Sequence, residues 1–151
     1  MAKKYNSGRP NHKGRNDSEQ YLSIPYSMAH TPAFRSLGGA ALKVWVELRS
    51  RYNGYNNGDL SLSLDEGARL LFIAKATVQR AFIELETKGF IKMIKRGQWY
   101  GRMATTWAIT DRSYQGHLAT RDWKNWRPDP PKKKTGSRFS SDTYLTDDEP
   151  V

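Results

Sequence analysis

Basic side chains gather in one stretch of the sequence, and their chemistry suits a polyanionic partner. Seven Lys and Arg residues lie between positions 75 and 102, where only Glu84 and Glu86 are acidic. This stretch therefore holds +5 of the +6 net charge of residues 23–110. Lysine and arginine bond phosphates, and arginine can enter a narrow minor groove. The pattern indicates nucleic acid as the partner.

One predicted helix in this stretch carries candidate base readers on its outer face. Gln79 has the amide geometry to pair with adenine, and Arg80 has the guanidinium fork to pair with guanine. Thr77 and Lys75 can instead bond phosphate. The alternative is that Arg80 only pairs with Glu84 on a solvated helix face. The predicted recognition set is Lys75, Ala76, Thr77, Gln79, Arg80 and Ile83.

A second group of candidates surrounds the turn of a predicted hairpin. Its positive and aromatic side chains suit phosphate contact or insertion of an arginine into a minor groove. The alternative is a basic hairpin that only meets solvent. The group consists of Lys95, Arg96, Trp99, Tyr100 and Arg102.

Enzyme chemistry finds little support in the sequence. The chain has no cysteine, and its three histidines are scattered over tails and connections with no metal spacing or triad partners: His12, His30 and His117. There is no phosphate-binding Gly-x-x-x-x-Gly-Lys loop and no dinucleotide fingerprint. We therefore expect a protein that is not an enzyme and needs neither a metal nor another cofactor.

Composition favours one intracellular domain with tails. The 151 residues carry a net charge of +10, and the mean hydropathy is −0.80. The longest apolar run, Leu70 to Ala74, is far below the roughly 20 residues that cross a bilayer, and no apolar signal core follows Met1. We expect no membrane association and a bacterial cytoplasmic location, at the nucleoid.

The chain divides into four predicted segments. Low apolar content predicts a basic disordered N-terminal tail, and proline and charge runs predict a disordered C-terminal tail with an acidic end. Between them lie a folded domain and a short tryptophan-containing extension. The expected bounds are 1–22 for the first tail, 23–110 for the domain, 111–126 for the extension and 127–151 for the second tail.

Apolar spacing within the domain predicts a fixed order of elements. Recurrence every three or four residues indicates helices, and alternation indicates strands. Ser63 and Glu66 have capping-box spacing, and Gly89 suits a helix end. The expected elements are helices over 37–52, 64–71 and 75–88, a short strand at 60–62, and a hairpin of strands 90–94 and 103–109.

Two flanking segments are expected to pack. Tyr21 to Ser27 is apolar enough to lie on the core. A short helix over 119–126, capped by Thr120, would place Trp123 and Trp126 on one side. Two such tryptophans should pack on the core or form a surface for a dimer or another partner.

This order of elements is that of an α+β winged helix-turn-helix domain: a three-helix core, a short strand and a β-hairpin wing. The run from Leu64 to Ile91, with Thr-Val-x-Arg-Ala followed by Leu-Glu-x-x-Gly-Phe-Ile, resembles the bacterial winged-helix signature. Residues 21–126 as a whole resemble small helix-turn-helix proteins of proteobacterial phages, plasmids and mobile elements. Ala74 departs from the usual Ser or Thr cap, and Phe72 departs from the usual turn glycine.

The resemblance implies binding of double-stranded DNA, with the third helix in the major groove and the wing on the backbone or minor groove. We expect a transcriptional regulator. Two alternatives stay open: a replication-initiator type module that binds origin repeats, and a protein-interaction adaptor that binds no DNA. A homodimer and a protein partner at the C-terminal region are both compatible with the sequence.

Overall fold

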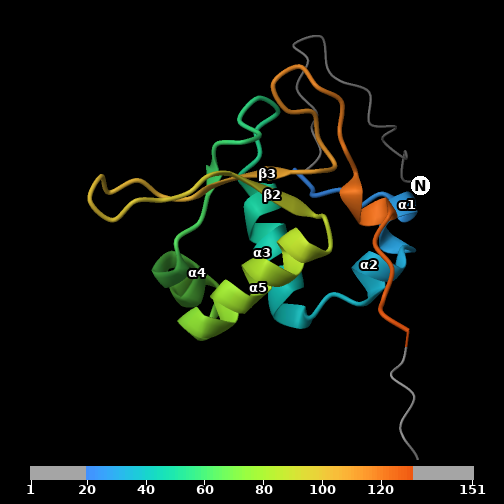
Figure 1. The fold of residues 1–151 in the computed structure, drawn as a ribbon, viewed down its shortest axis with the longest axis horizontal. Helices are drawn as coiled ribbons and strands as arrows, with labels where there is room; N and C mark the ends of the chain where they lie inside the picture. The colour runs from blue at the N-terminus through green and yellow to red at the C-terminus, as the bar shows by residue number, and fades with distance from the viewer. Residues whose placement is uncertain (1–19, 131–151) are drawn as a thin grey trace, which may run out of the picture.

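A computed structural model describes residues 20–130 of the chain as an α+β fold (Figure 1). The predicted tails fall largely on residues 1–19 and 131–151, which lie outside the described residues. Within the described part, five α-helices precede or alternate with a three-stranded antiparallel sheet. The elements are α1 (Tyr26–Ala29), α2 (Pro32–Arg35), α3 (Gly39–Ser50), β1 (Leu60–Ser61), α4 (Leu64–Leu71), α5 (Lys75–Thr87), β2 (Ile91–Lys95), β3 (Thr106–Ile109) and a 3₁₀ helix, η1 (Asp122–Lys124).

The helices agree with the expected ones most closely where one end carries a capping signal. α4 has the predicted bounds, and α5 ends at Thr87, shortly before Gly89, whose φ of +79° suits glycine. The helix expected over 37–52 is shorter, because α3 begins at Gly39 and ends at Ser50. Two single-turn helices, α1 and α2, were not expected.

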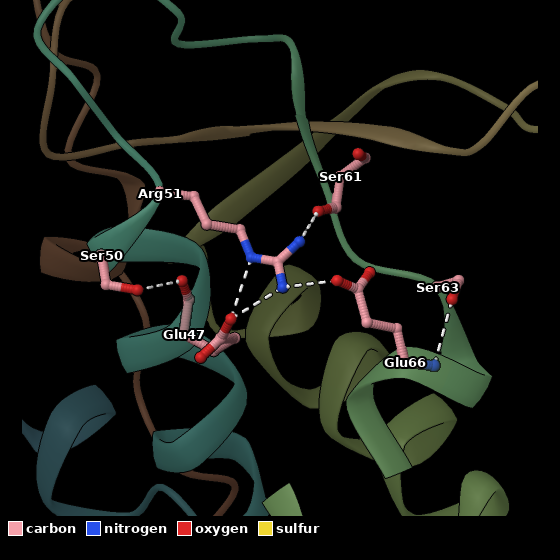
Figure 2. Close-up of polar contacts among 6 residues, drawn as sticks. All are labelled: Glu47, Ser50, Arg51, Ser61, Ser63 and Glu66. Atoms are coloured by element: carbon pink, nitrogen blue, oxygen red, sulfur yellow. Dashed lines mark hydrogen bonds and ion pairs between the residues drawn. The ribbon is translucent and has the colours of Figure 1, made fainter. Parts of the chain in front are cut away.

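The start of α4 is held by a polar network centred on Arg51 (Figure 2). Ser63 Oγ accepts a hydrogen bond from Glu66 N at 3.1 Å, which is one half of the predicted capping box. The Glu66 carboxylate also accepts a hydrogen bond from Arg51 at 2.9 Å. Arg51 also donates to Glu47 at 2.7 Å and to the carbonyl oxygen of Ser61 at 2.8 Å. One guanidinium therefore joins α3, β1 and α4.

The sheet has the order β1-β3-β2, and β3 is its central strand. Leu60 pairs with Trp107, and Ile91 pairs with Ile109. β2 begins one residue later than expected, and only the last four residues of the predicted strand 103–109 belong to β3. Beyond an irregular register at residues 93–95, the two arms continue as a long hairpin that projects from the domain (Figure 1).

The hydrophobic core lies between the helices and the sheet and is rich in aromatic rings. Trp45 of α3 is fully buried and meets Phe90 edge to face at 6.4 Å between ring centroids. Phe82 of α5 stacks on Trp107 of β3 at 4.9 Å. Aromatic pairs of this kind contribute about 0.5–1.5 kcal/mol beyond their buried area. The Phe82–Trp107 stack holds α5 against the base of the hairpin.

Asn57 completes the sheet where β1 is too short to do so. Its side chain is buried, accepts a hydrogen bond from Ile109 N at 2.8 Å and donates to Ile109 O at 3.0 Å. It also donates to the carbonyl oxygens of Arg112 and Ser113. In a sequence, an Asn-Gly pair such as Asn57 and Gly58 indicates a tight turn and gives no sign of this role.

The segments on either side of the domain pack in part as expected. Leu22 and Met28 contact the core, whereas Tyr21 and Tyr26 are each 82% exposed, so the expectation that residues 21–27 lie on the core is correct only for part of them.

The helix expected over 119–126 is wrong: only η1 forms there, and no side chain caps it. Trp123 is 2% exposed and stacks on Phe90 at 6.3 Å, while Trp126 is partly buried against the core. Both tryptophans therefore pack on their own domain. None of the helices formed by residues 20–130 has the length and apolar character that a membrane crossing needs.

Candidate nucleic-acid interface

The outer face of α5 is set by the residues that the helix buries. Val78, Ala81, Phe82 and Leu85 are buried, as the sequence predicts. This leaves Gln79, Ile83 and Glu86 in line on the opposite side, one helical turn apart. Ile83 is 57% exposed, which is a large apolar surface for a helix position.

A groove of about 1150 Å³ lies between this helix face and the hairpin. Its walls come from the outer face of α5, the segment that leads into α4, and both arms and the turn of the hairpin. The lining brings together predicted members of both groups: Gln79, Ile83, Arg96, Trp99, Tyr100 and Arg102. Residues from the helix and from the hairpin therefore share one concave surface.

The other predicted residues lie beside the groove and do not line it. Arg80 and Ala76 are exposed on the adjacent face of α5, and Thr77 is half-buried. Lys75 forms an ion pair with Asp65 of α4, so its charge is already partnered. Lys95 is exposed at the end of β2, outside the groove lining.

The alternative role suggested for Arg80 is wrong. Its guanidinium approaches only its own helix, with Nη2 3.4 Å from Thr77 Oγ1 and Nε 3.4 Å from the carbonyl oxygen of Ala76. Glu84 does not pair with Arg80, because it accepts hydrogen bonds from Lys88 Nζ at 2.7 Å and from Gly38 N at 2.9 Å.

Glu84 thus serves to fix α5 on the start of α3. Partial burial opposes ionisation of Glu84, but the bonds from Lys88 and Gly38 outweigh it and lower the pKa of the carboxyl. Lys88 Nζ also donates to the carbonyl oxygen of Ser36 at 2.7 Å. A Cβ atom at Gly38 would lie 3.2 Å from a Glu84 oxygen, so this approach is close. The position of α5 is therefore set by polar contacts of Glu84 and Lys88 with the segment before α3 and by the stacking of Phe82 on Trp107 of the sheet.

The electrostatics of the interface are dominated by cations. The ion pairs among residues 20–130 leave four of the predicted cations without an acidic partner: Arg80, Lys95, Arg96 and Arg102. The groove lining itself contains one acidic side chain, Glu86. A carboxylate at such a place can accept a hydrogen bond from a cytosine amino group and repels phosphate.

Both residues that depart from the winged-helix pattern, Phe72 and Ala74, lie in the turn between α4 and α5. Phe72 has φ +55°, the left-handed region that favours glycine, and its side chain is 92% exposed. Ala74 is the N-cap of α5, and no side chain caps this end. The two helices also pack closely beside this turn, because a Cβ atom at Gly67 would lie 2.9 Å from a methyl group of Val78.

Some groove residues were missed by the sequence reasoning. Met93 is 37% exposed and Met103 is 57% exposed, and both line the groove together with Glu86. Their positions on the two arms of a predicted hairpin were a signal, because alternate strand residues share a face.

Searches for metal and family relationships give no further site. Residues 20–130 contain no group of three or more His, Cys, Asp or Glu side chains that could hold a metal ion. Comparisons with protein-family models, with curated proteins and with solved structures found no match. The resemblance to small helix-turn-helix proteins of mobile elements stays a prediction.

Proposed function

We propose that the protein is a winged-helix protein that binds double-stranded DNA sequence-specifically and regulates transcription. The order α3, β1, α4, α5, β2, β3 and the sheet order β1-β3-β2 are compatible with that fold. In this assignment α5 enters the major groove and the hairpin is the wing. The single observation that carries the proposal is the shared groove between the exposed face of α5 and the arginine-bearing hairpin.

The proposal divides the residues by what they contact. Gln79 lines the groove, where its amide can read adenine, and Arg80, exposed beside it, can read guanine. Arg96 and Arg102 on the wing contact phosphate or a minor groove. Each good bidentate base contact contributes about 1–3 kcal/mol of discrimination against the wrong base.

The number of unpartnered cations sets the expected salt dependence. If the three wing cations, Lys95, Arg96 and Arg102, each neutralise a phosphate, the affinity should fall with salt at a log-log slope of about −2.7. An adaptor that acts only on proteins would shift no duplex at low salt. Measurement of duplex binding between low and high salt therefore separates the two classes of function.

The experiment is selection of bound fragments from random duplex DNA, followed by titration of the selected site. Arg80→Ala should change the preferred sequence, whereas Arg96→Ala should weaken all sequences alike and flatten the salt slope by about 0.9. Arg35→Ala, an exposed arginine on α2, is the matched control and should change neither. Equal losses for the variants at positions 80 and 96 on every sequence would contradict the division of roles.

The location of the selected site then assigns the biological role. Overlap with a promoter supports regulation of transcription, and repeated sites at an origin support replication initiation instead. Half-site spacing reports whether the protein binds as a dimer.

A further inference from the structure

The turn of the hairpin presents two adjacent aromatic side chains to solvent. Trp99 is 91% exposed and Tyr100 is 100% exposed, whereas Trp107 at the base of the same hairpin is 5% exposed. Both rings border the groove described above. Large apolar side chains gathered at an exposed tip usually mark a contact surface. Packing within the domain does not account for these two.

The backbone beneath these rings is firmly held. Gln98 and Met103 exchange two backbone hydrogen bonds, at 3.0 and 3.2 Å, directly below the turn. A Cβ atom at Gly97 would lie 2.7 Å from Met103 O, so the two arms of the hairpin are too close here for any residue but glycine. Arg102 closes the turn with φ +49°, and its N–H donates to Trp99 O at 3.3 Å. The aromatic pair is therefore displayed on a structured support.

The charges around the pair select an anionic partner. Arg96 and Arg102 border the groove beside the rings, and Lys95 lies one residue before Arg96. None of these three cations has an acidic partner among residues 20–130. Aromatic rings interleaved with cations are the combination that binds single-stranded nucleic acid, because the rings stack on bases and the cations follow the phosphates.

Stacking of this kind distinguishes unpaired from paired DNA. In a duplex each base is covered on both faces by its neighbours, so a solvent-exposed ring can stack only after a step is opened, which costs a few kcal/mol of stacking free energy. An unpaired base offers its face without that cost. An exposed aromatic tip next to a helix proposed to bind duplex DNA therefore favours DNA in which paired and unpaired segments adjoin.

We propose that Trp99 and Tyr100 form a stacking site for unpaired DNA bases, so that the protein prefers a duplex interrupted by unpaired nucleotides. The duplex part of this preference rests on the proposed function. The stacking site itself does not, because it can act on a single strand alone. Arg96 and Arg102 hold the phosphates of the unpaired strand.

The test compares three labelled oligonucleotides at one salt concentration by fluorescence anisotropy. The first is the selected site as a fully paired duplex, the second is the same duplex with a short internal bubble of unpaired thymines, and the third is a thymine single strand. The wild-type protein should bind the bubbled duplex about tenfold or more tightly than the paired one, within the range seen for stacking aromatics in other proteins.

Variants assign that preference to the tip. Trp99→Ala should remove most of the tenfold gain, so that the variant binds the bubbled and the paired duplex within about twofold of each other, and Trp99→Phe should restore most of the gain because phenylalanine also stacks. Tyr55→Ala is the matched control, since Tyr55 is 97% exposed but lies outside the groove. Thermal unfolding should be unchanged in Trp99→Ala because the side chain packs little.

The outcomes separate the two proposals. Equal wild-type affinity for paired and bubbled duplexes overturns the stacking site but leaves duplex binding intact. Binding of the single strand with the same dependence on Trp99, but without duplex binding, supports the stacking site and overturns the proposed function. Loss of self-association in Trp99→Ala with no change in any DNA affinity overturns the stacking site and assigns the tip to a contact between copies of the protein.

Discussion

The substitution Asn57→Ala gives the most quantitative test of how the base of the hairpin is built. The change removes the side-chain bonds to both backbone groups of Ile109, a residue that is fully buried. Each buried polar group left without a partner costs about 1–3 kcal/mol, so two such groups cost about 2–6 kcal/mol in the free energy of unfolding. Domains of this size are stable by only about 5–15 kcal/mol.

Urea unfolding, followed through the fluorescence of the buried tryptophans, measures this loss directly. Asn53→Ala is the matched control, because Asn53 accepts two backbone hydrogen bonds within an exposed loop where water can replace it. We expect a loss of about 2 kcal/mol or more for position 57 and less than about 1 kcal/mol for position 53. Similar values for the two variants would refute the claim that Asn57 completes the sheet.

Three further predictions concern the helices that carry the interface. Gly67→Ala should lower the free energy of unfolding by about 1–2 kcal/mol, because the new Cβ atom would lie 2.9 Å from a Val78 methyl group and this overpacking outweighs the gain in helix propensity. Gly39→Ala, where the new Cβ atom meets open space, should cause no such loss in the same urea titrations. In the folded protein the pKa values of Glu66 and Glu84 lie below the ordinary 4.5, that of Glu66 chiefly because of its hydrogen bond to Arg51. The contribution of these two carboxylates to the free energy of unfolding should therefore be complete above pH 4.5 and disappear as the pH falls through the folded pKa values. In the variant that combines Glu66→Gln with Glu84→Gln, the free energy of unfolding should fall less steeply as the pH is lowered. The same pH dependence as in the wild-type protein would contradict this prediction. Ala74→Ser should stabilise α5 by about 1 kcal/mol in the same assay, and no gain would show that a side-chain cap cannot act there.

The elements that sequence reasoning predicted best have strong periodicity and a capping signal at one end. The helix that became α4 begins after a serine cap, and the helix that became α5 repeats its apolar residues until Gly89. α1 and α2 escaped prediction because a single turn of four residues is too short to show a period. Their prolines, Pro25 and Pro32, indicate helix starts only once the following turn is known.

The parts of the site that were missed depend on partners distant in the chain. Lys75 belongs to the predicted recognition set, and the structure adds an ion pair between it and Asp65 on the preceding helix. The alternative interpretation paired Glu84 with Arg80, but Glu84 instead accepts a hydrogen bond from the backbone N–H of Gly38, 46 residues away. Spacing along one helix predicts which residues share a face, and it cannot predict which neighbouring element competes for them.

The position of η1 has a practical consequence for protein engineering. Packing of Trp123 on Phe90 brings the end of the described chain to the side of α2, and Figure 1 shows this orange segment at the opposite end of the ribbon from the hairpin turn. A reporter or affinity handle attached beyond residue 130 therefore starts remote from the concave surface. Surface immobilisation through that attachment would leave the surface open to soluble oligonucleotides, which suits binding measurements in flow.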